Sequence, residues 1–577
     1  MDVNKALIAL NLQNSYKIIM ASDKIPQKKL TLIKGTNIII RIETSEIREC
    51  IMNKTGKKGT QGVNGKKNAV RPYTVMCTDI YLLLILIVFP LYFADGYFHL
   101  PEKKAMFWTV STLIYVIVCM IGVIITAFFM REYWSMENLK KNFTMMDACM
   151  LGFLISNLIA LAMSNDTLGS WVGAGSRYYG ARVLILVCVS YFLISRYAWL
   201  NKVFIIAFLI GGNGVCLLAT FDYFGMDVLG INQQMQQTDW LIFISTIGNA
   251  NTCASYVCMA LAGAMVFFCI EKGLKLKIFA GLSIINCAAA LVTSRSDSAF
   301  AGIAVIIVVL AVLAAANKID LKDYILMLAL VDAGLLILFI LRKIFVKHLI
   351  LESFDSGLPS ALNQPLLLGI ILLVILSAYG GVRYTVQKHI KINKNTKIGI
   401  AVISGVIVAV FTFIFANRLG IADIFKSGMG ISESTVTGSR SYIYERTLQV
   451  YGKLPFRNKV FGCGQASILG VLNKYFGEEL SAAGIGINSA HNNILDYLII
   501  TGLFGVVCYL GTVVCSIKHA FQTLKENESA LIYGVIVIAY FAQGLFNIDQ
   551  AITTPVFWLM VTCCEAMYRR NILKKEI

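Results

Sequence analysis

A histidine followed by two asparagines stands at the start of the apolar segment INSAHNNILDYLIITGLFGVVCYL, residues 487 to 510. The chain contains only five histidines, so His491 at a membrane boundary either caps a helix or takes part in chemistry. A neutral imidazole, with an ordinary pKa of about 6.5, can accept a proton near neutral pH. At a helix N-terminus the helix dipole favours this uncharged form. His491 is therefore a candidate general base, with helix capping as the alternative.

Polar residues interrupt other apolar segments of the chain in a similar way. Arginines occur in GAGSRYYGAR (Arg177 and Arg182) and in TSRSDSAF (Arg295), and asparagines occur in STIGNANTCASY (Asn249 and Asn251). Charged side chains near membrane depth are costly and tend to mark sites or pathways. Because a guanidinium pairs bidentately with phosphate oxygens, such arginines beside a histidine would suit a diphosphate. Taken singly, the arginines could instead reach the membrane surface from helix ends, and the asparagines could cap a helix.

Helical spacing indicates which neighbours could assist His491. At about 100° per residue, Gly502 and Gly505 return to its side of a continuous helix, whereas Asp496 lies on another side with the two asparagines. Small residues beside the histidine would let another helix or a lipid chain approach closely. Asp496 is therefore a poor candidate for orienting the imidazole.

Composition identifies the elements that must position these residues. The 577 residues are 57% hydrophobic and 15% charged, and the mean hydropathy of +0.70 is too high for an average soluble protein. A helix needs about 20 mostly apolar residues to cross a membrane. We predict an all-α polytopic membrane protein with about 12 to 14 transmembrane helices, of which 276–293 and 366–382 are the least distinct. The apolar stretches are 76–93, 107–130, 145–163, 181–199, 203–221, 251–270, 276–293, 299–316, 324–341, 366–382, 398–416, 492–516, 530–546 and 551–567.

The net charge of +18 could suggest a nucleic-acid partner, but its distribution indicates membrane topology instead. If the basic tail YRRNILKKEI is cytoplasmic, an even number of helices places the N-terminus there too. The short loops then assigned to the inside, such as EKGLKLK and VRYTVQKHIKINKNTK, are the richer in lysine and arginine. This asymmetry follows the positive-inside rule. We expect both termini in the cytoplasm and no nucleic-acid partner.

The same pattern divides the chain into five parts. Residues 1–75 are polar and Lys-rich, so we expect a disordered cytoplasmic segment without a signal peptide, and Met52 could be the native start. Residues 76–416 hold eleven predicted helices, 417–490 form a long external loop, 491–567 hold three more helices, and 568–577 form the basic tail. Loops as long as 417–490 are usually functional or disordered.

Helical patterning predicts that the long loop is ordered. In GSRSYIYERTLQVYGKLP, Arg440, Tyr444, Leu448 and Tyr451 recur at helical spacing, and Pro455 marks the end of the helix. The alternation of loops places this amphipathic helix outside the membrane, on the face that also carries His491. Arg440 thereby joins the other arginines as a candidate for binding an anion.

Several classes of site have no support in the sequence. Most of the fifteen cysteines lie in apolar stretches and no CxxC pair occurs, which favours packing roles over zinc or disulfides. The chain has no Asp-x-Asp pair, no GxGxxG and no P-loop. A soluble metal-dependent nucleotide-sugar transferase and an ATP-driven exporter are therefore not supported, and we expect neither a metal nor a cofactor.

Taken in order, these motifs resemble the bacterial O-antigen ligase and O-antigen polymerase superfamily of membrane glycosyltransferases. The matching features are GNAN at the start of a helix, TSRSDSAFAG between two helices, TGSRSYIYERTLQVY followed by FGCG in the long loop, and AHNNILDYLIITGLFGVV. They extend from about residue 245 to 510. The chain departs from the family at Asn249-Ala250-Asn251, where relatives often have Asn-Pro-Asn.

The resemblance implies a C-type glycosyltransferase fold in the bacterial cytoplasmic membrane, with the active site facing outside. It implies metal-independent transfer or polymerisation of a glycan from an undecaprenyl-diphosphate-linked donor to a glycan or lipid-glycan acceptor. His491 corresponds to the family's external histidine. The residues expected to bind the diphosphate or substrate are Arg440, Arg295, Arg177, Arg182, Asn249, Asn251 and Asn492. The expected partners are therefore the donor, the acceptor and membrane lipid.

Two rival interpretations remain open at the level of sequence. A transporter or flippase for lipid-linked polysaccharide would also be polytopic, although no internal repeat is evident. A cell-wall glycan polymerase of the shape, elongation and division class would share the helical architecture. Ligase and polymerase are not separated, because both use the same donor chemistry. Asp332, within the apolar LALVDAGLLIL, is unexplained, with a structural role and a functional role both open.

Overall fold

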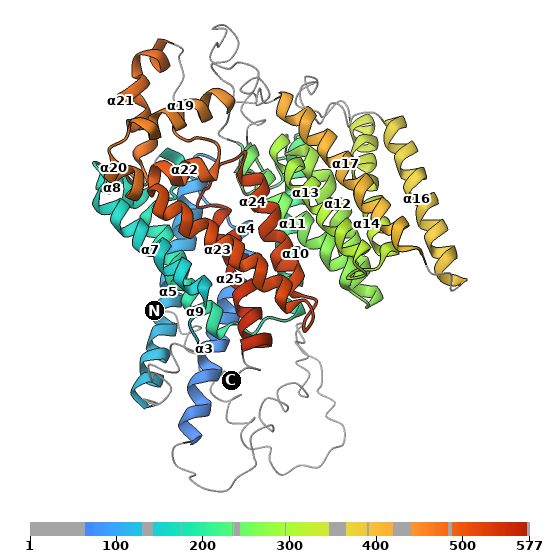
Figure 1. The fold of residues 1–577 in the computed structure, drawn as a ribbon, viewed down its shortest axis with the longest axis horizontal. Coiled ribbons are helices and arrows are strands. Elements are labelled where there is room, and N and C mark those ends of the chain that lie inside the picture. Colours follow the sequence, from blue (N-terminus) through green and yellow to red (C-terminus); the bar gives the residue numbers. More distant parts are fainter. Residues whose placement is uncertain are drawn as a thin grey trace. The chain divides into compact units, whose positions relative to one another are not determined.

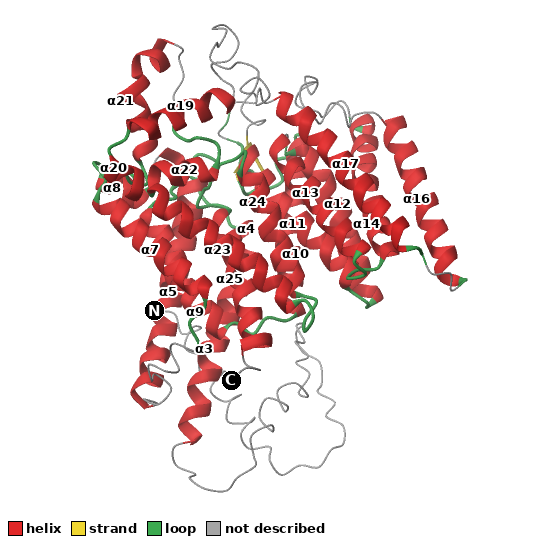
Figure 2. Cartoon of the chain, viewed as in Figure 1, coloured by secondary structure: helices red, strands yellow, loops and turns green. Residues whose placement is uncertain are grey.

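The computed structural model describes residues 64–129, 142–173, 175–233, 235, 243–294, 296–345, 365–388, 392–418, 440–482 and 487–573, and the structural statements below concern these residues. They belong to one compact unit, residues 64–577. This unit is mainly helical, with one short antiparallel hairpin of β1 (Phe243–Ile244) and β2 (Gly248–Asn249) (Figure 2).

The helices follow one another along the chain as shown in Figure 1. They are α3 (Asn64–Leu83), the π-helical turn η1 (Leu84–Val88), α4 (Phe89–Leu91), α5 (Leu100–Phe129), α7 (Met145–Ala162), α8 (Thr167–Val172), the 3-10 turn η3 (Gly175–Arg177), α9 (Ala181–Tyr197), α10 (Lys202–Tyr223), α11 (Ala250–Ile270), α12 (Leu274–Thr293), α13 (Asp297–Ala315), α14 (Leu321–Ile344), α16 (Pro365–Gln387), α17 (Lys394–Arg418), α19 (Arg440–Lys453), α20 (Phe456–Phe461), α21 (Ser467–Ala482), α22 (Asn493–Ile500), α23 (Gly502–Thr523), α24 (Ala530–Gly544), α25 (Thr554–Tyr568) and the π-helical turn η6 (Arg569–Leu573).

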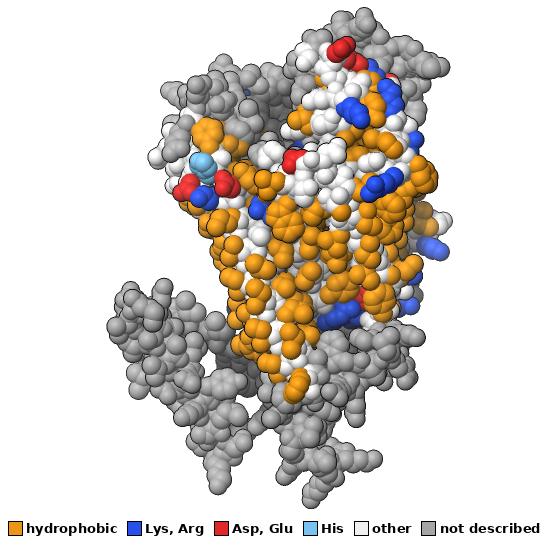
Figure 3. Space-filling view, turned by 90° about the vertical axis from the view of Figure 1, so that its left-hand side faces the viewer, with side chains coloured by type: hydrophobic (Ala, Val, Ile, Leu, Met, Phe, Trp, Pro, Cys, Tyr) orange, Lys and Arg blue, Asp and Glu red, His pale blue; other side chains and the backbone are white. Residues whose placement is uncertain are grey.

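Ten of the described helical segments are long and apolar enough to cross a membrane. They are Tyr73–Leu91, Leu100–Ile125, α7, α10, α11, α12, Ser298–Ala315, α14, Leu368–Gln387 and α23. Hydrophobic side chains form a band around the middle of the face drawn in Figure 3. The chain is therefore a multi-pass membrane protein. The other four predicted stretches lie on α9, α17, α24 and α25, which are also helices but fall outside these ten, so the finer count of 12 to 14 stays a prediction.

The first helix begins earlier than the sequence analysis predicted. α3 starts at Asn64, so residues 64–75, which were expected to be disordered, are helical. Extending an existing helix adds one hydrogen bond per residue and avoids the cost of nucleation, so the polar residues before the apolar segment can continue its helix. Residues 1–63 lie outside the described part of the chain, and so does Met52.

α11 lies at the centre of the bundle and packs against α10, α12, α13 and α24. Almost every residue of α11 is buried. Small side chains allow this close packing. Gly302 of α13 is one example, because a Cβ there would lie 2.6 Å from Cys258 Sγ and 2.9 Å from Ala539 O.

α19, α20 and α21 form a cap, residues 440–482, that joins the bundle through α22 and α23 (Figure 1). A helix, α19, lies where the sequence predicts the amphipathic helix, and it ends two residues before Pro455. Leu448, one of the residues that recur at helical spacing, is 51% exposed. The buried face instead carries Tyr442, Ile443, Thr447, Val450 and Leu454, since α19 packs against α21 and α22 on that side.

The predicted continuous helix 492–516 is wrong, because the structure divides it into α22 and α23 at Thr501 and Gly502. Gly502 has a φ of 68°, a conformation that suits glycine. The cap uses the carbonyls left free at this break, since Cys463 N donates to Ile499 O at 2.9 Å and Gly464 N to Ile500 O at 3.1 Å. The helix break is thus the joint between the cap and the bundle.

A network of buried charges joins four helices far from the cap. Asp147 of α7 pairs with Arg569 and, at 3.1 Å, with Arg196 of α9. Glu565 of α25 lies 2.8 Å from Arg569 Nε and 2.6 Å from Nδ1 of His519 on α23. Because both carboxylates have ion-pair partners, the network links α7, α9, α23 and α25 without leaving either acid alone.

Candidate functional site

The structure brings His491, Arg177 and Arg440 together at one end of the helix bundle. His491 lies in the turn before α22, Arg177 ends the short η3 turn, and Arg440 is the first residue of α19. Burial and, to a lesser extent, the positive charges of Arg440 and Arg177 together lower the pKa of His491 from 6.5 to about 4. The imidazole is therefore uncharged near neutral pH in the unliganded protein.

The backbone of His491 is held in an unusual conformation. Its φ of 51° lies in the left-handed region, which costs a residue other than glycine about 1 kcal/mol or more. Asp496 organises this turn by accepting hydrogen bonds from Ser489 Oγ at 2.7 Å and Ala490 N at 2.6 Å. His491 N in turn donates to Ser489 Oγ at 2.9 Å. Asp496 thus holds the main chain beneath His491, and among the described residues no hydrogen bond reaches the imidazole ring itself.

Asn492, rather than His491, caps the helix. Its Oδ1 accepts hydrogen bonds from Ile494 N at 2.9 Å and Leu495 N at 3.1 Å, which satisfies free donors at the start of α22. Its Nδ2 donates to Leu545 O at 2.9 Å. With the cap supplied by its neighbour, the imidazole of His491 is available for another role.

Tyr444 connects the cap to this turn. Its hydroxyl lies 3.2 Å from the carbonyl oxygen of His491 and 3.0 Å from that of Leu545, so α19 is held against both the His491 turn and the loop after α24. Arg440 lies one helical turn before Tyr444 on α19. Burial raises the pKa of Tyr444 to about 12, although the charge of Arg440 opposes this shift. The hydroxyl therefore stays protonated and acts as a hydrogen-bond donor.

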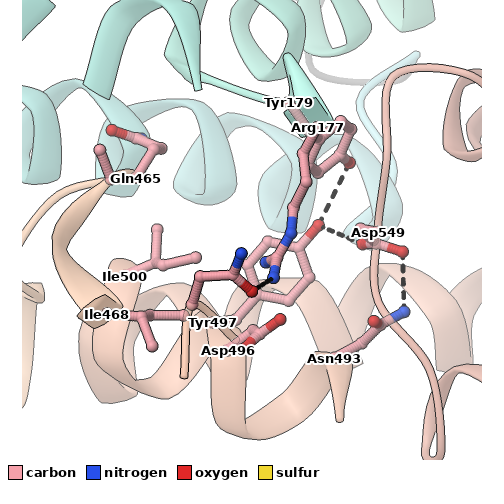
Figure 4. Close-up of a pocket in the computed structure, with 11 residues that line it drawn as sticks. Arg177, Tyr179, Gln465, Ile468, Asn493, Asp496, Tyr497, Ile500 and Asp549 are labelled. Carbon is pink, nitrogen blue, oxygen red and sulfur yellow. Dashed lines mark hydrogen bonds between the residues drawn. The ribbon is translucent and has the colours of Figure 1, made fainter. Parts of the chain in front are cut away.

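Arg177 is fixed by contacts to both flanking loops (Figure 4). Its Nη2 donates to Asn488 Oδ1 at 2.5 Å, and its carbonyl oxygen accepts from Ala551 N at 3.1 Å. Burial lowers the pKa of Arg177, whereas the nearby carboxylates Asp496 and Asp549 oppose that shift. The guanidinium is thus held between two acids and the His491 turn.

Asp549 is a site residue that the sequence analysis missed. It lies, buried, in the loop between α24 and α25. It accepts hydrogen bonds from Asn493 Nδ2 at 2.8 Å and Tyr497 OH at 2.8 Å (Figure 4), and from Tyr540 OH at 2.9 Å. Burial raises its pKa to about 6, and the hydrogen bonds from the two tyrosines oppose the shift. The sequence feature that could have pointed to Asp549 is its place as an acidic residue in the loop FNIDQAITTP, on the same predicted membrane face as His491.

A small polar cavity lies behind Arg177. Its volume is about 30 Å³, and its walls include Arg177, Gln465, Asn493, Asp496 and Asp549 (Figure 4). This space admits only a few water molecules. It is too small for a sugar ring, and His491 is not among its lining residues. The cavity is therefore interior space supporting the arginine rather than a substrate pocket.

The remaining predicted site residues fall in three groups. Asn249 caps α11, because its Oδ1 accepts from Asn251 N at 3.0 Å, and Asn251 O accepts from Asn547 Nδ2 at 2.8 Å. Arg182 is the second residue of α9, and its Nε is buried without a hydrogen bond to any described residue. Arg295 lies outside the described residues. Asn249 thus caps a helix, the alternative role named for it above, whereas the hydrogen bonds that Asn251 makes with described residues involve only its main chain.

Comparisons with known proteins add no identity. No protein-family model matches the chain, and no curated protein matches it. The resemblance to the O-antigen ligase and polymerase superfamily therefore stays a prediction. Among the described residues there is no group of three or more His, Cys, Asp or Glu side chains that could hold a metal ion.

Proposed function

We propose that this protein is a membrane glycosyltransferase that transfers or polymerises a glycan from an undecaprenyl-diphosphate-linked donor at the outer face of the bacterial cytoplasmic membrane. The observation that carries the proposal is the association of an uncharged, half-buried His491 with Arg177 and Arg440 at one end of a membrane helix bundle. It extends the resemblance to the O-antigen ligase and polymerase superfamily from motifs to an arrangement in space.

The arrangement has the parts that such a reaction requires. The acceptor hydroxyl forms a bond to the anomeric carbon of the donor sugar while the bond from that carbon to the diphosphate breaks. His491 takes the hydroxyl proton, a role typically worth a hundred- to ten-thousand-fold in rate. Arg177 and Arg440 stabilise the charge of the departing lipid diphosphate as preorganised cations. No metal is needed for either task.

The low pKa of His491 also suits a cycle controlled by the donor. In the unliganded site two arginines disfavour the imidazolium. A bound diphosphate brings negative charge beside the same arginines, which opposes their effect and raises the pKa of His491. The histidine then becomes a stronger base only when the leaving group is in place, so an acceptor hydroxyl is activated after the donor has bound.

The proposal is tested by complementing a strain that lacks the gene. His491→Asn is the sharpest variant, because asparagine tolerates the left-handed backbone that position 491 adopts and lacks a basic imidazole. We expect His491→Asn to abolish glycan transfer and Arg440→Ala to lower it by about a hundredfold or more while both variants stay in the membrane. Leu448→Ala, an exposed position on the same helix as Arg440, is the matched control and should retain transfer.

The lipid-linked glycans of the deletion strain separate the two forms of the activity. Accumulated single repeats indicate a lost polymerase, and accumulated long chains indicate a lost ligase. A product distribution in the His491→Asn strain equal to that of the wild type would refute the catalytic role of His491.

Transport of a lipid-linked glycan is the second candidate, and Asp332 is the observation that favours it. Asp332 lies in the middle of α14, and its Oδ2 is buried without a hydrogen bond to any described residue. Isolated acids in membrane helices often belong to transport pathways. Asp332→Asn should leave transfer unchanged if the protein is the enzyme, whereas loss of glycan export with intact lipid-linked chains would favour the transporter.

A further inference from the structure

A second, larger cavity lies between two loops at the ends of α4 and α10. It is open, has a volume of about 620 Å³, and is lined mainly by Asp95, His99, Glu102, Lys103 and Gln233, which we call the polar bowl. Small-molecule sites commonly have volumes of about 300–1,000 Å³. The bowl therefore has room for a ligand of one or two sugar rings, unlike the small cavity behind Arg177.

The bowl is built on two tightly connected turns. Asp95, Gly96 and Gly230 have φ values of 59°, 68° and 65°, so both loops reverse sharply at the cavity. Tyr97 N donates to Ile231 O at 3.1 Å and joins the two loops. Tyr97 and Ile231 also belong to a small buried apolar cluster beneath the turns. The walls of the bowl are therefore fixed relative to each other by the main chain.

The side chains that line the bowl are polar, and their charges partly cancel. Lys103 Nζ pairs with Asp95 at 2.7 Å, and His99 Nδ1 lies 3.8 Å from Glu102. Each of these side chains is at least one-third exposed. Figure 3 shows a group of acidic, basic and histidine side chains directly above the apolar band. Carboxylates can accept, and lysine and the Gln233 amide can donate, hydrogen bonds to hydroxyl groups.

This chemistry favours an uncharged ligand that is rich in hydroxyl groups. A phosphate would need free cations, but the one lysine of the bowl is already paired with Asp95. A divalent cation would need several oxygen ligands, yet the described residues contain no group of three acids, histidines or cysteines placed to hold one. An apolar ligand is disfavoured because Ile231 is the main apolar side chain in the lining. A neutral sugar is none of these three ligands, and its hydroxyl groups can pair with the polar side chains of the bowl.

The bowl and the His491 site lie at the same end of the bundle. A Cβ on Gly248 would lie 3.2 Å from the ring of Tyr97, so the loop that carries Asp95 and His99 packs on the residue before Asn249. The turn at Asn249 leads to Asn251, whose carbonyl accepts from Asn547 in the loop that carries Asp549. Phe98 is not one of the residues that line the bowl, but it precedes His99 in the chain and is 61% exposed, so its ring is open to a sugar that extends beyond the bowl.

We propose that the polar bowl is a glycan-binding subsite that holds uncharged sugar units of the acceptor or of the growing chain. Its link to the reaction rests on the proposed glycosyltransferase function, whereas sugar binding itself does not. The subsite keeps a glycan near the end of the bundle where His491 lies, without touching the diphosphate of the donor.

The test measures sugar binding to the full chain in lipid nanodiscs by saturation-transfer difference NMR. The probes are N,N′-diacetylchitobiose as an uncharged sugar, a glucuronic-acid disaccharide as an anionic one, and calcium chloride. We expect saturable binding of the uncharged sugar in the millimolar range and at least fivefold weaker binding of the anionic sugar. Phe98→Ala with Gln233→Ala should weaken binding of the uncharged sugar at least fivefold. Val228→Ala, exposed on the same loop, is the control and should change nothing.

The outcomes separate this proposal from the proposed function. His491→Asn should retain full sugar binding, because it removes the base and not the bowl. If sugar binds and no glycan transfer is found, the glycosyltransferase function fails and the subsite stands. If transfer occurs but the double variant binds sugar as well as the wild type, the subsite is refuted. The subsite is also refuted if no sugar binds at concentrations up to 50-fold above a Kd of about 1 mM. It is likewise refuted if calcium binds at Asp95 and displaces the sugar.

Discussion

Donor binding should shift the pH dependence of glycan transfer. In the unliganded protein the pKa of His491 falls from 6.5 to about 4, mainly through burial and then through Arg440 and Arg177. At about 1.36 kcal/mol per pKa unit, this corresponds to about 3 kcal/mol of bias against the imidazolium. Since kcat/KM reports the free enzyme and kcat reports the donor complex, the acid limb of kcat should lie at higher pH than that of kcat/KM.

Arg440→Gln tests which charges cause the shift. Burial is the largest cause, so one arginine accounts for less than half of it. Removing its charge stabilises the imidazolium, and the acid limb of kcat/KM should rise by about 0.5–1 pH unit, which equals about 0.7–1.4 kcal/mol. Arg457→Gln, which removes a charge from the exposed side of α20, is the matched control, because Arg457 is not among the groups that shift the pKa of His491.

The assay uses purified protein in nanodiscs with a synthetic polyprenyl-diphosphate-linked oligosaccharide, and mass spectrometry of the products from about pH 4 to pH 8, a range around the ordinary pKa of histidine. A diphosphate diester stays fully ionised over this range, so the limb does not arise from the donor. The reasoning is refuted if the acid limb of kcat lies at or below that of kcat/KM. It is also refuted if Arg457→Gln shifts the limb as much as Arg440→Gln does.

Three further substitutions test the framework by thermal denaturation in detergent. Gly502→Ala should lower Tm, because φ at Gly502 is 68° and a Cβ would lie 2.4 Å from a carbonyl oxygen of the cap. The control Gly470→Ala has open space around the new Cβ and should stabilise the protein by up to about 1 kcal/mol. Equal effects of the two substitutions on Tm would contradict the role of Gly502 as the joint between cap and bundle. Asp549→Asn should cost about 1–3 kcal/mol, because the carboxylate accepts several buried hydrogen bonds. Folding raises the pKa of Asp549 from 3.8 to about 6, so the folded state binds the proton more tightly than the unfolded state does. The unfolding free energy of the wild type, compared with that of Asp549→Asn, should therefore increase as pH falls from about 6 towards 3.8. A difference between the two proteins that does not change with pH would contradict this reasoning. Glu565→Gln should cost about 3–5 kcal/mol by leaving Arg569 with one fewer buried partner, and an unchanged Tm would show that this ion pair contributes little.

The positions of the membrane helices along the chain could be predicted from the sequence, because they depend on local composition. A run of about 20 apolar residues must form its own hydrogen bonds in lipid, so it becomes a helix whatever its neighbours are. Each predicted stretch accordingly lies on one helix or, at 76–93 and 492–516, on consecutive helical segments. The amphipathic helix of the long loop was also predictable, because Pro455 and the helical spacing after Arg440 are local signals.

The packed faces and the helix break could not be predicted in this way. Hydropathy gives no information on the direction in which a helix is turned, and α19 buries Ile443 and Val450 while Leu448 stays exposed, since α21 and α22 pack on that side. The break at Gly502 depends on the cap, whose main chain approaches the end of α22 from about 40 residues earlier in the chain, at Cys463 and Gly464. A helical wheel drawn through residue 502 is therefore not valid for the residues that follow it.

The sequence alone determined that this is a helical multi-pass membrane protein, because apolar length and charge are properties of each segment by itself. It also directed attention to His491, Arg177 and Arg440 through residue type and spacing. Only the tertiary structure decided that Asn492 makes the helix cap, that Asp496 supports the turn, and that Asp549 lies beside Arg177. These roles depend on contacts between residues from different loops, and the electrostatic effect of a charge on the pKa of His491 depends on distance and burial, which folding alone establishes.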